Sequence, residues 1–297
     1  MRLRTSRAAF LLTLLALSAG AISGCGSEKE AGTEDMAVNR ARQVAAAWDG
    51  SPAADAWRAG YYPMEEAVQL PRGGLRSQAD KRAYQAQNFV LRGKLPTTRP
   101  KGGLVAWASG KTLSRPLMGA QTAYMTLARA RVDGIPHLTV TGAKLGEMSL
   151  ATSRGPATVP AWFFTLQGYT APLKRAAASP SKLPRPPIQP ARDFPAGQLA
   201  PLDRLVQIDG DRRSVTVNAI HGACDDGPAV DVLETRGSVV LSASVKNPKT
   251  GDCTTQAKGK HVTVKLDRPV HDRVLLDAYT GRPVPYGQPN EPSPSWS

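Results

Sequence analysis

The chain has 297 residues, of which 27 are glycine, 25 are proline and only 6% are aromatic. This abundance of turn-forming residues argues against a helical bundle and favours β structure, in one large domain or two small ones. The chain has 38 Lys and Arg but only 24 Asp and Glu, which gives a net charge of +14. This positive charge excludes the acidic classes of protein. Such a surplus is typical of a protein that meets polyanions or keeps a strongly solvated surface.

Residues 1–24 have the layout of a secretory leader. Arg2, Arg4 and Arg7 precede an uncharged apolar run from 8 to 21, which small residues follow. At 1.5 Å per residue this run is about 20 Å long, shorter than the ~30 Å hydrocarbon core that a spanning helix must cross. The leader has no Arg-Arg pair, so we expect export by general secretion and not by the twin-arginine route.

The leader ends in the sequence ISGC, Ile22 to Cys25. This tetrapeptide resembles the lipobox of bacterial lipoproteins, and the resemblance implies cleavage before Cys25 and a diacylglyceryl group on its sulfur. A thiolate is a suitable nucleophile for that alkylation, and two acyl chains anchor stably where one is marginal. The alternative is an ordinary leader followed by an unrelated cysteine. We expect a lipid-anchored protein on the outer face of the cytoplasmic membrane.

Residues 25–36 are small and charged and predict a flexible lipidated tether. After it, residues 37–178 mix helical spacing with short apolar runs and predict a basic α+β domain. We expect helices over 37–50, 51–64, 77–87 (with Ser77 as N-cap) and 119–134, strands over 88–95, 102–110 and 157–169, and a strand pair over 137–152 that turns near Gly146.

Prolines accumulate over 179–201 and predict an extended linker, which either separates two domains or lies across one. Residues 202–287 alternate apolar and polar side chains in four segments, which indicates antiparallel strands with one buried face. Residues 288–297 form a loose tail. The expected fold class is therefore α+β: an N-terminal α+β domain followed by a C-terminal antiparallel β-sandwich-like domain that one disulfide pins.

That disulfide is expected between the two cysteines that remain beside the lipidation site, Cys224 and Cys253. An even remainder in an oxidising compartment is typical of a disulfide. Closing a loop of about 30 residues would stabilise the domain by roughly 3–4 kcal/mol. The alternative is metal ligation that includes His221, but zinc needs four ligands and no CxxC or HxxxH pair supplies them.

Motifs that carry chemistry are weak in this sequence. The sequence SGKT at 109–112 resembles the end of a phosphate-binding loop, but Val105 replaces the leading glycine, so we predict a hairpin turn. KTG at 249–251 is interpreted as a turn. No Gly-x-Ser-x-Gly elbow accompanies the histidines at 137, 221, 261 and 271, so we predict no catalytic residues, no cofactor and no enzyme activity. A weak calcium site is one interpretation of four acidic residues, and a turn into a strand is the other: Asp225, Asp226, Asp231 and Glu234.

The positive charge is concentrated in one part of the chain. Residues 37–200 hold 22 Lys and Arg against 8 Asp and Glu, whereas residues 201–297 hold 12 of each. Outside the membrane the available polyanions are lipid head groups and anionic envelope polymers, and nucleic acid is not expected. Each cation near an anionic surface adds about 1 kcal/mol, and a flexible tether with a span of about 20 Å would let the basic region reach the bilayer. The alternative is a solvated surface with no partner.

Three stretches resemble uncharacterised lipoproteins of actinobacteria: SRGPATVPAWFFTLQGY at 153–169, HGACDDGPAVDVLE at 221–234 and VKLDRPVHDRVLLDAYTGRPV at 264–284. The resemblance implies a membrane-anchored envelope protein of a Gram-positive cell in which Cys224 and Cys253 are paired. We expect a non-catalytic binding or scaffold module, whose partner is the envelope polymer, lipid or a protein. The alternatives are an envelope hydrolase with a site assembled from scattered loops, and an accessory subunit of a membrane complex.

Overall fold

The computed structural model describes residues 28–98, 100–129, 134–192, 194–195, 197–249, 254 and 256–286. Its fold is mixed α and β, as the sequence predicts, with the chain mostly in sheets. Two hydrophobic cores are present, one within residues 61–178 and one that combines the first two helices with the C-terminal sheets. We call the first the basic region and the second, with its helices, the C-terminal region. None of the described helices has the length and apolarity needed to cross a membrane.

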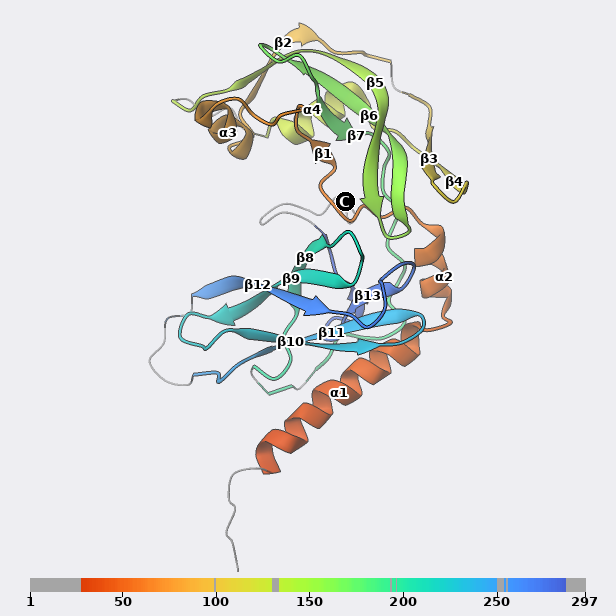
Figure 1. Ribbon diagram of the computed structural model, residues 1–297, viewed down its shortest axis with the longest axis vertical. Coiled ribbons are helices and arrows are strands. Elements are labelled where there is room, and N and C mark those ends of the chain that lie inside the picture. Colours follow the sequence, from red (N-terminus) through yellow and green to blue (C-terminus); the bar gives the residue numbers. More distant parts are fainter. Residues whose placement is uncertain are drawn as a thin grey trace, which may run out of the picture.

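The first helix, α1 (Glu28–Trp48), occupies much of the segment that was expected to be a flexible tether. Twenty-one residues at 1.5 Å each make it about 32 Å long. Ala41, Val44, Ala45 and Trp48 recur at helical spacing and are buried in the C-terminal core. There α1 packs on β11 (Ser238–Val245) and β10 (Pro228–Glu234). The N-terminal half of α1 extends past these strands, at the end of the molecule opposite the basic region (Figure 1).

The second helix, α2 (Pro52–Ala59), leads into the junction between the cores. Its N-cap is Ser51, whose Oγ accepts a hydrogen bond from the Ala54 N–H at 3.2 Å. Both α1 and α2 were expected in the basic α+β domain, but their buried side chains belong to the other core. Periodicity shows that a helix has an apolar face, not which sheet covers that face.

Two adjacent tyrosines divide between the two cores. Tyr61 is buried in the basic region, and Tyr62 is buried in the C-terminal core, where its ring stacks on Trp57 with centroids 4.2 Å apart. A side chain on Gly60 would place its Cβ 2.4 Å from the Tyr62 ring, so this stacking requires a glycine there. The two regions are thus joined by a packed segment and not by a loose hinge.

The basic region is built on one curved sheet. The strand order is β1-β7-β6-β3-β4, with β5 antiparallel to β6 and β2 parallel to β5. Helices α3 and α4 cover part of the sheet, and Trp162 on β6 donates from Nε1 to the Met118 carbonyl before α4 at 2.9 Å. The elements are β1 (Val68–Gln69), α3 (Gln78–Gln85), β2 (Phe89–Lys94), β3 (Gly103–Trp107), β4 (Thr112–Arg115), α4 (Ala120–Leu127), β5 (Leu138–Thr152), β6 (Gly155–Leu166) and β7 (Leu173–Ala176).

Two expectations for this region need correction. The predicted strand pair over 137–152 is one strand of 15 residues, β5, and the chain turns only at the hairpin into β6. Gly146 sits within the strand because a Cβ there would lie 2.8 Å from the Phe163 ring on β6. Helix α4 ends at Leu127, well before Gly134. The Ser77 N-cap of α3 is confirmed, since its Oγ accepts from the Asp80 N–H at 3.0 Å.

The proline-rich linker runs from one core to the other. Its start is fixed to the basic region, where Arg115 Nε donates to the Ser179 carbonyl at 2.8 Å. Further along, Ile188 and Ala191 pack into the C-terminal core, and the Ala191 N–H donates to the Tyr279 carbonyl at 2.7 Å. The linker therefore packs on both regions instead of spacing them apart.

The C-terminal region has two sheets that share one core, with α1 as a third layer (Figure 1). Because α1 covers one face of β11 and the second sheet covers the other, six consecutive residues of β11 are buried where alternation was expected. The region is not entirely antiparallel, since β11 pairs with β13 in parallel. The strands are β8 (Leu202–Ile208), β9 (Ser214–Gly222) and β12 (Ala257–Lys265) in one sheet, and β10 (Pro228–Glu234), β11 (Ser238–Val245), β13 (Val274–Asp277) and β14 (Arg282–Pro283) in the other.

Candidate functional site

Two of the three cysteines, Cys25 and Cys253, lie outside the described residues. Cys224 is exposed in the turn after β9. The preceding Ala223 N–H donates to the Gln256 carbonyl at 3.0 Å, so this turn lies beside the segment that leads into β12. The Cys224–Cys253 pairing stays a prediction.

The four carboxylates of the suggested calcium site do not come together. Asp225 precedes β10 and accepts the Gly222 and Lys249 N–H groups at 2.7 and 2.9 Å, and these bonds lower its pKa. Glu234 is the last of the seven residues of β10 and lies about 20 Å from the start of that strand. Among the described residues no group of three or more His, Cys, Asp or Glu side chains could hold a metal ion. Asp225 and Glu234 stabilise turns instead.

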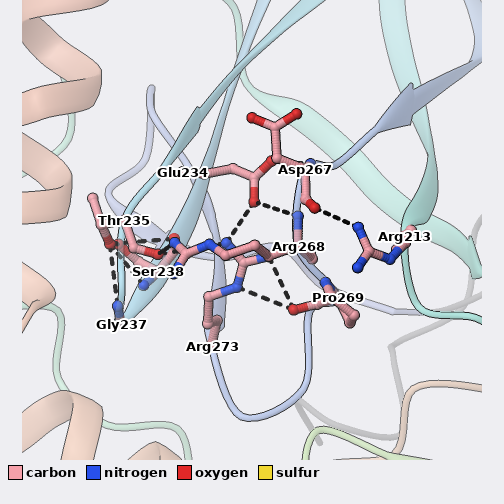
Figure 2. A network of polar contacts seen from close by, with 9 residues as sticks. All are labelled: Arg213, Glu234, Thr235, Gly237, Ser238, Asp267, Arg268, Pro269 and Arg273. Atoms are coloured by element: carbon pink, nitrogen blue, oxygen red, sulfur yellow. Dashed lines mark hydrogen bonds and ion pairs between the residues drawn. The ribbon is translucent and has the colours of Figure 1, made fainter.

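Glu234 belongs to a network of polar contacts around the buried side chain of Arg273, in the turn before β13 (Figure 2). Arg273 is 5% exposed, and its Nη1 donates to Glu234 Oε2 at 2.7 Å. Its other donors reach the carbonyls of Arg268 and Pro269, and Glu234 Oε1 accepts the Asp267 N–H at 2.6 Å. Burial by itself would raise the pKa of Glu234, but these hydrogen bonds outweigh it and lower the pKa. The network holds two turns together.

The remaining motif residues are scattered. His137, His261 and His271 are exposed on different elements, and His221 is half-buried at the end of β9. The SGKT sequence forms the predicted hairpin turn between β3 and β4, in which the Gly110 N–H donates to the Trp107 carbonyl at 2.9 Å. For KTG, only Lys249 lies within the described part of the chain.

A Ser-x-x-Lys sequence, Ser179 to Lys182, also occurs in the linker and was not singled out from the sequence. The chain is not helical there, so the two side chains are not brought to one helix face. The Ser179 carbonyl accepts from Arg115, and the Lys182 carbonyl accepts from the Tyr62 hydroxyl at 3.1 Å. This sequence therefore serves the junction between the regions.

A hollow of about 340 Å³ lies where α1 and α2 meet two turns of the C-terminal region. Its lining includes two arginines and two aspartates, so opposite charges balance within it. Arg58 is already paired with Asp55 on α2 at 2.9 Å. The lining residues are Asp49, Gly50, Arg58, Arg236, Gly237 and Asp272. With its charges balanced, the hollow does not select an ionic ligand by sign.

The basic region differs, because its surface charge has one sign. Residues 61–178 contain 16 Lys and Arg against 5 Asp and Glu. Within the described part of this region Glu147 is an exposed carboxylate, and the others, Glu65, Glu66 and Asp80, are half-buried. The exposed cations are Arg72, Arg76, Lys81, Arg82, Arg92, Lys94, Lys101, Lys111, Arg129 and Lys144. This surface is suited to a polyanion.

Three lysines and one phenylalanine share an open face of the curved sheet. Lys144 on β5 pairs with Phe163 on β6, and Phe163 pairs with Lys174 on β7, so the three lie in one row on one face. In the adjacent row Lys94 on β2 pairs with Gly142, which lies two positions from Lys144 on β5 and therefore on the same face. We call Lys94, Lys144, Phe163 and Lys174 the lysine–phenylalanine face.

The geometry of this face depends on two glycines. A Cβ at Gly146 would lie 2.8–3.2 Å from the tip of the Phe163 ring, so the ring rests over bare backbone. Gly142 has no atom within 4 Å of its Cβ position, so the space above it is open. Lys174 Nζ lies 5.1 Å from the centre of the Phe163 ring, within cation–π range.

The opposite face of the same strands is closed by the core. The neighbours of Phe163 in sequence, Trp162 and Phe164, are both buried, and Tyr124 of α4 packs 6.5 Å from Phe164. The lysine–phenylalanine face is thus the half of the sheet that the helices leave uncovered. Composition predicted a basic region, but only strand register identifies which cations share a face with an aromatic ring.

The chain matches no protein-family model, no curated protein and no solved structure.

Proposed function

We propose that this protein is an exported, lipid-anchored binding module that presents its basic region to an anionic polymer of the cell envelope. The anchor would be Cys25, with the Cys224–Cys253 disulfide bracing the C-terminal region. The observation that supports this function is the separation of charge. In the described part of the basic region ten exposed cations accompany a single exposed carboxylate, Glu147, whereas the C-terminal sheets expose both cations and carboxylates. The basic region lies at the end of the molecule opposite the N-terminal end of α1 (Figure 1).

The position of α1 supports one of the two anionic partners that the sequence suggests. Cys25 is three residues before Glu28, the first residue of α1. Lipidation there puts the membrane at the N-terminal end of a helix about 32 Å long, whose C-terminal half is packed into the C-terminal core. The C-terminal region then lies nearer the bilayer and the basic region farther away. At ionic strengths that make the Debye length about 8–10 Å, head groups are screened from cations held at that distance. An envelope polymer fits better than the protein's own bilayer.

Two other functions have less support. An envelope hydrolase would need acidic or nucleophilic side chains gathered in a concave site, and the described hollow has its carboxylates balanced by arginines. An accessory role in a membrane complex would use the same anchor and is tested by crosslinking in cells followed by mass spectrometry. A dominant crosslink to one membrane protein would favour that role over polymer binding.

The test of the proposal has two parts. Intact mass analysis of the native protein is expected to find the diacylglyceryl group on Cys25. Binding of the purified full chain to soluble poly(glycerol phosphate) and to alginate is then measured as salt is raised. We expect the affinity to fall steeply with ionic strength, as electrostatic binding requires. An intact leader would refute the anchor, and an affinity indifferent to salt would refute the electrostatic contact.

A further inference from the structure

We infer that the lysine–phenylalanine face is the contact surface for this polymer, and that the polymer it fits is an acidic polysaccharide. The inference rests on the proposed function and adds both a location and a ligand class. Its basis is the juxtaposition, on one uncovered sheet face, of a half-buried aromatic ring with three lysines from three strands.

The charge arrangement suits an extended polyanion. Neighbouring strands lie about 4.8 Å apart, so Lys144 and Lys174, on either side of β6, are about 10 Å apart across the sheet. Lys94 extends the row of charge to the edge strand β2. In this register no acidic residue falls in the two rows: their other members are Gln69, Gly142 and Thr165. A polyanion lying across the strands would meet a lysine at each end of its contact with the sheet and no negatively charged side chain in these two rows.

The aromatic ring narrows the ligand class further. A linear polyphosphate or poly(glycerol phosphate) would need only the lysines. Phe163 adds a half-buried aromatic ring whose tip lies over Gly146, and the exposed part of such a ring packs against the apolar C–H face of a sugar ring. Lys174 Nζ stands close to the same ring, so a carboxylate or phosphate on that sugar could pair with it while the ring stays in contact. Rings that carry charge match this face best.

The structure offers a matched control for the charges. Strand β12 also carries three exposed lysines, Lys258, Lys260 and Lys265, but it lies in the C-terminal region. The face variant K94Q/K144Q/K174Q and the control variant K258Q/K260Q/K265Q therefore remove equal charge from strand positions. Phe163→Leu removes the aromatic ring and keeps an apolar side chain over Gly146.

The experiment measures binding of the full-length variants to three polymer probes and, as a fourth probe, to vesicles rich in anionic lipid, all at one ionic strength. Alginate has charged rings, poly(glycerol phosphate) has charge without rings, and dextran has rings without charge. We expect the face variant to lose at least tenfold in affinity for alginate and more than the control variant loses, because several lysines act together. Phe163→Leu is expected to lose about threefold to tenfold for alginate and nothing for poly(glycerol phosphate), the range that one aromatic contact accounts for.

The outcomes separate this inference from the proposed function. If wild type binds alginate with steep salt dependence but the face and control variants weaken equally, the face is not the contact surface although the function stands. If Phe163→Leu weakens both charged probes alike or neither, the polysaccharide class is wrong. If only vesicles rich in anionic lipid respond to the face variant, the occupant is a lipid surface. If wild type binds neither charged polymer, the proposed function itself fails. Thermal unfolding of each variant shows that it is folded, and the lysine variants keep the test open if Phe163→Leu does not fold.

Discussion

In the C-terminal region Arg273 is almost completely buried and donates its hydrogen bonds to Glu234 and to two turns. In the basic region Lys94 and Lys144 project from strands into water, and Lys174 is half-buried against a phenylalanine. The C-terminal region has equal numbers of acidic and basic residues after residue 200. Some of them, such as Arg273 and Glu234, form hydrogen bonds that hold turns of the same region together. Both regions expose most of their cations, but the described part of the basic region exposes only one carboxylate beside them, so its surface charge has one sign.

The two regions also differ in which parts of the chain form their hydrophobic cores. The core of the basic region comes from one continuous stretch of chain, residues 61–178. The C-terminal core is completed by α1, whose Trp48 donates from Nε1 to the Gly281 carbonyl at 2.9 Å across 233 residues of sequence. The helix that would carry the lipid anchor is therefore an integral part of the C-terminal core. Four variants probe this contrast, from the largest expected effect to the smallest.

Removing Trp48 tests whether α1 belongs to the C-terminal core. Trp48→Ala deletes a fully buried indole and one hydrogen bond, and we expect a loss of about 3–5 kcal/mol in the free energy of unfolding. Urea denaturation measures it. The control is Val38→Ala on the same helix, where the side chain is 39% exposed and the loss should stay within about 0.5 kcal/mol. Equal effects of the two substitutions would mean that α1 is not packed as described.

Breaking the buried ion pair between Arg273 and Glu234 tests whether it stabilises the C-terminal region. Arg273→Met leaves the Glu234 carboxylate without its main partner, and we expect a loss of about 3 kcal/mol in the free energy of unfolding. Arg204→Met breaks a more exposed pair in the same region, where the Asp203 side chain is 38% exposed, and should cost under about 1 kcal/mol. A loss from Arg273→Met no larger than that of its control would contradict the role assigned to the network.

Acidity should affect the C-terminal region through Asp277, at the end of β13. Burial raises the pKa of Asp277 to about 6, against an ordinary value of 3.8, although Thr280 and the Tyr279 N–H donate to its carboxylate. The folded state thus holds this proton more tightly than the unfolded chain does. Its stabilising contribution is complete below about pH 4 and is lost as the pH rises through about 6, a change of about 3 kcal/mol.

Asp277→Asn is the variant that checks this pH dependence. It keeps the shape of the side chain and removes the titration, so the decline in the free energy of unfolding between about pH 4 and pH 7 should become shallower. Denaturation curves across this range, for wild type and variant, give the difference. Parallel pH profiles would show that Asp277 titrates as an ordinary carboxyl group.

The smallest effect is expected in the basic region, at the glycine beneath Phe163. Gly146→Ala places a methyl group 2.8 Å from the ring, and we expect about 1–2 kcal/mol of destabilisation as the ring shifts. Gly142→Ala on the same strand meets open space and is the matched control, with little or no loss expected. Thermal unfolding measures both. If both alanines were tolerated equally, Phe163 would not rest over Gly146.

Local features of the fold were predictable from the sequence and long-range ones were not. The Ser77 cap and the SGKT hairpin depend on neighbouring residues, and both were predicted. Gly146 was misread as a turn because a glycine in a strand can mark either a turn or a close approach, and Phe163 lies 17 positions away. The partner of α1 and the parallel pairing of β11 with β13 are likewise set by segments distant in sequence.

The candidate site shows the same division. The sequence predicted the excess of cations over residues 37–200, which is a property of composition. It did not identify Lys94, Lys144 and Lys174 as a set, because they share a face only through the pairing of β2 with β5, β5 with β6 and β6 with β7, and these pairings are not visible in the sequence. The prediction of a calcium site was wrong for a related reason. Acidic residues that are close in sequence lie far apart when the chain between them is an extended strand.

Neutron reflectometry of the lipidated protein on a supported bilayer tests the central claim most directly, namely that the basic region is held away from the membrane. The account predicts an elongated density profile with the basic region distal to the bilayer, unchanged when anionic lipid replaces zwitterionic lipid. Soluble acidic polysaccharide should then add density at the distal end. A profile that collapses onto the bilayer when anionic lipid is present would contradict the account.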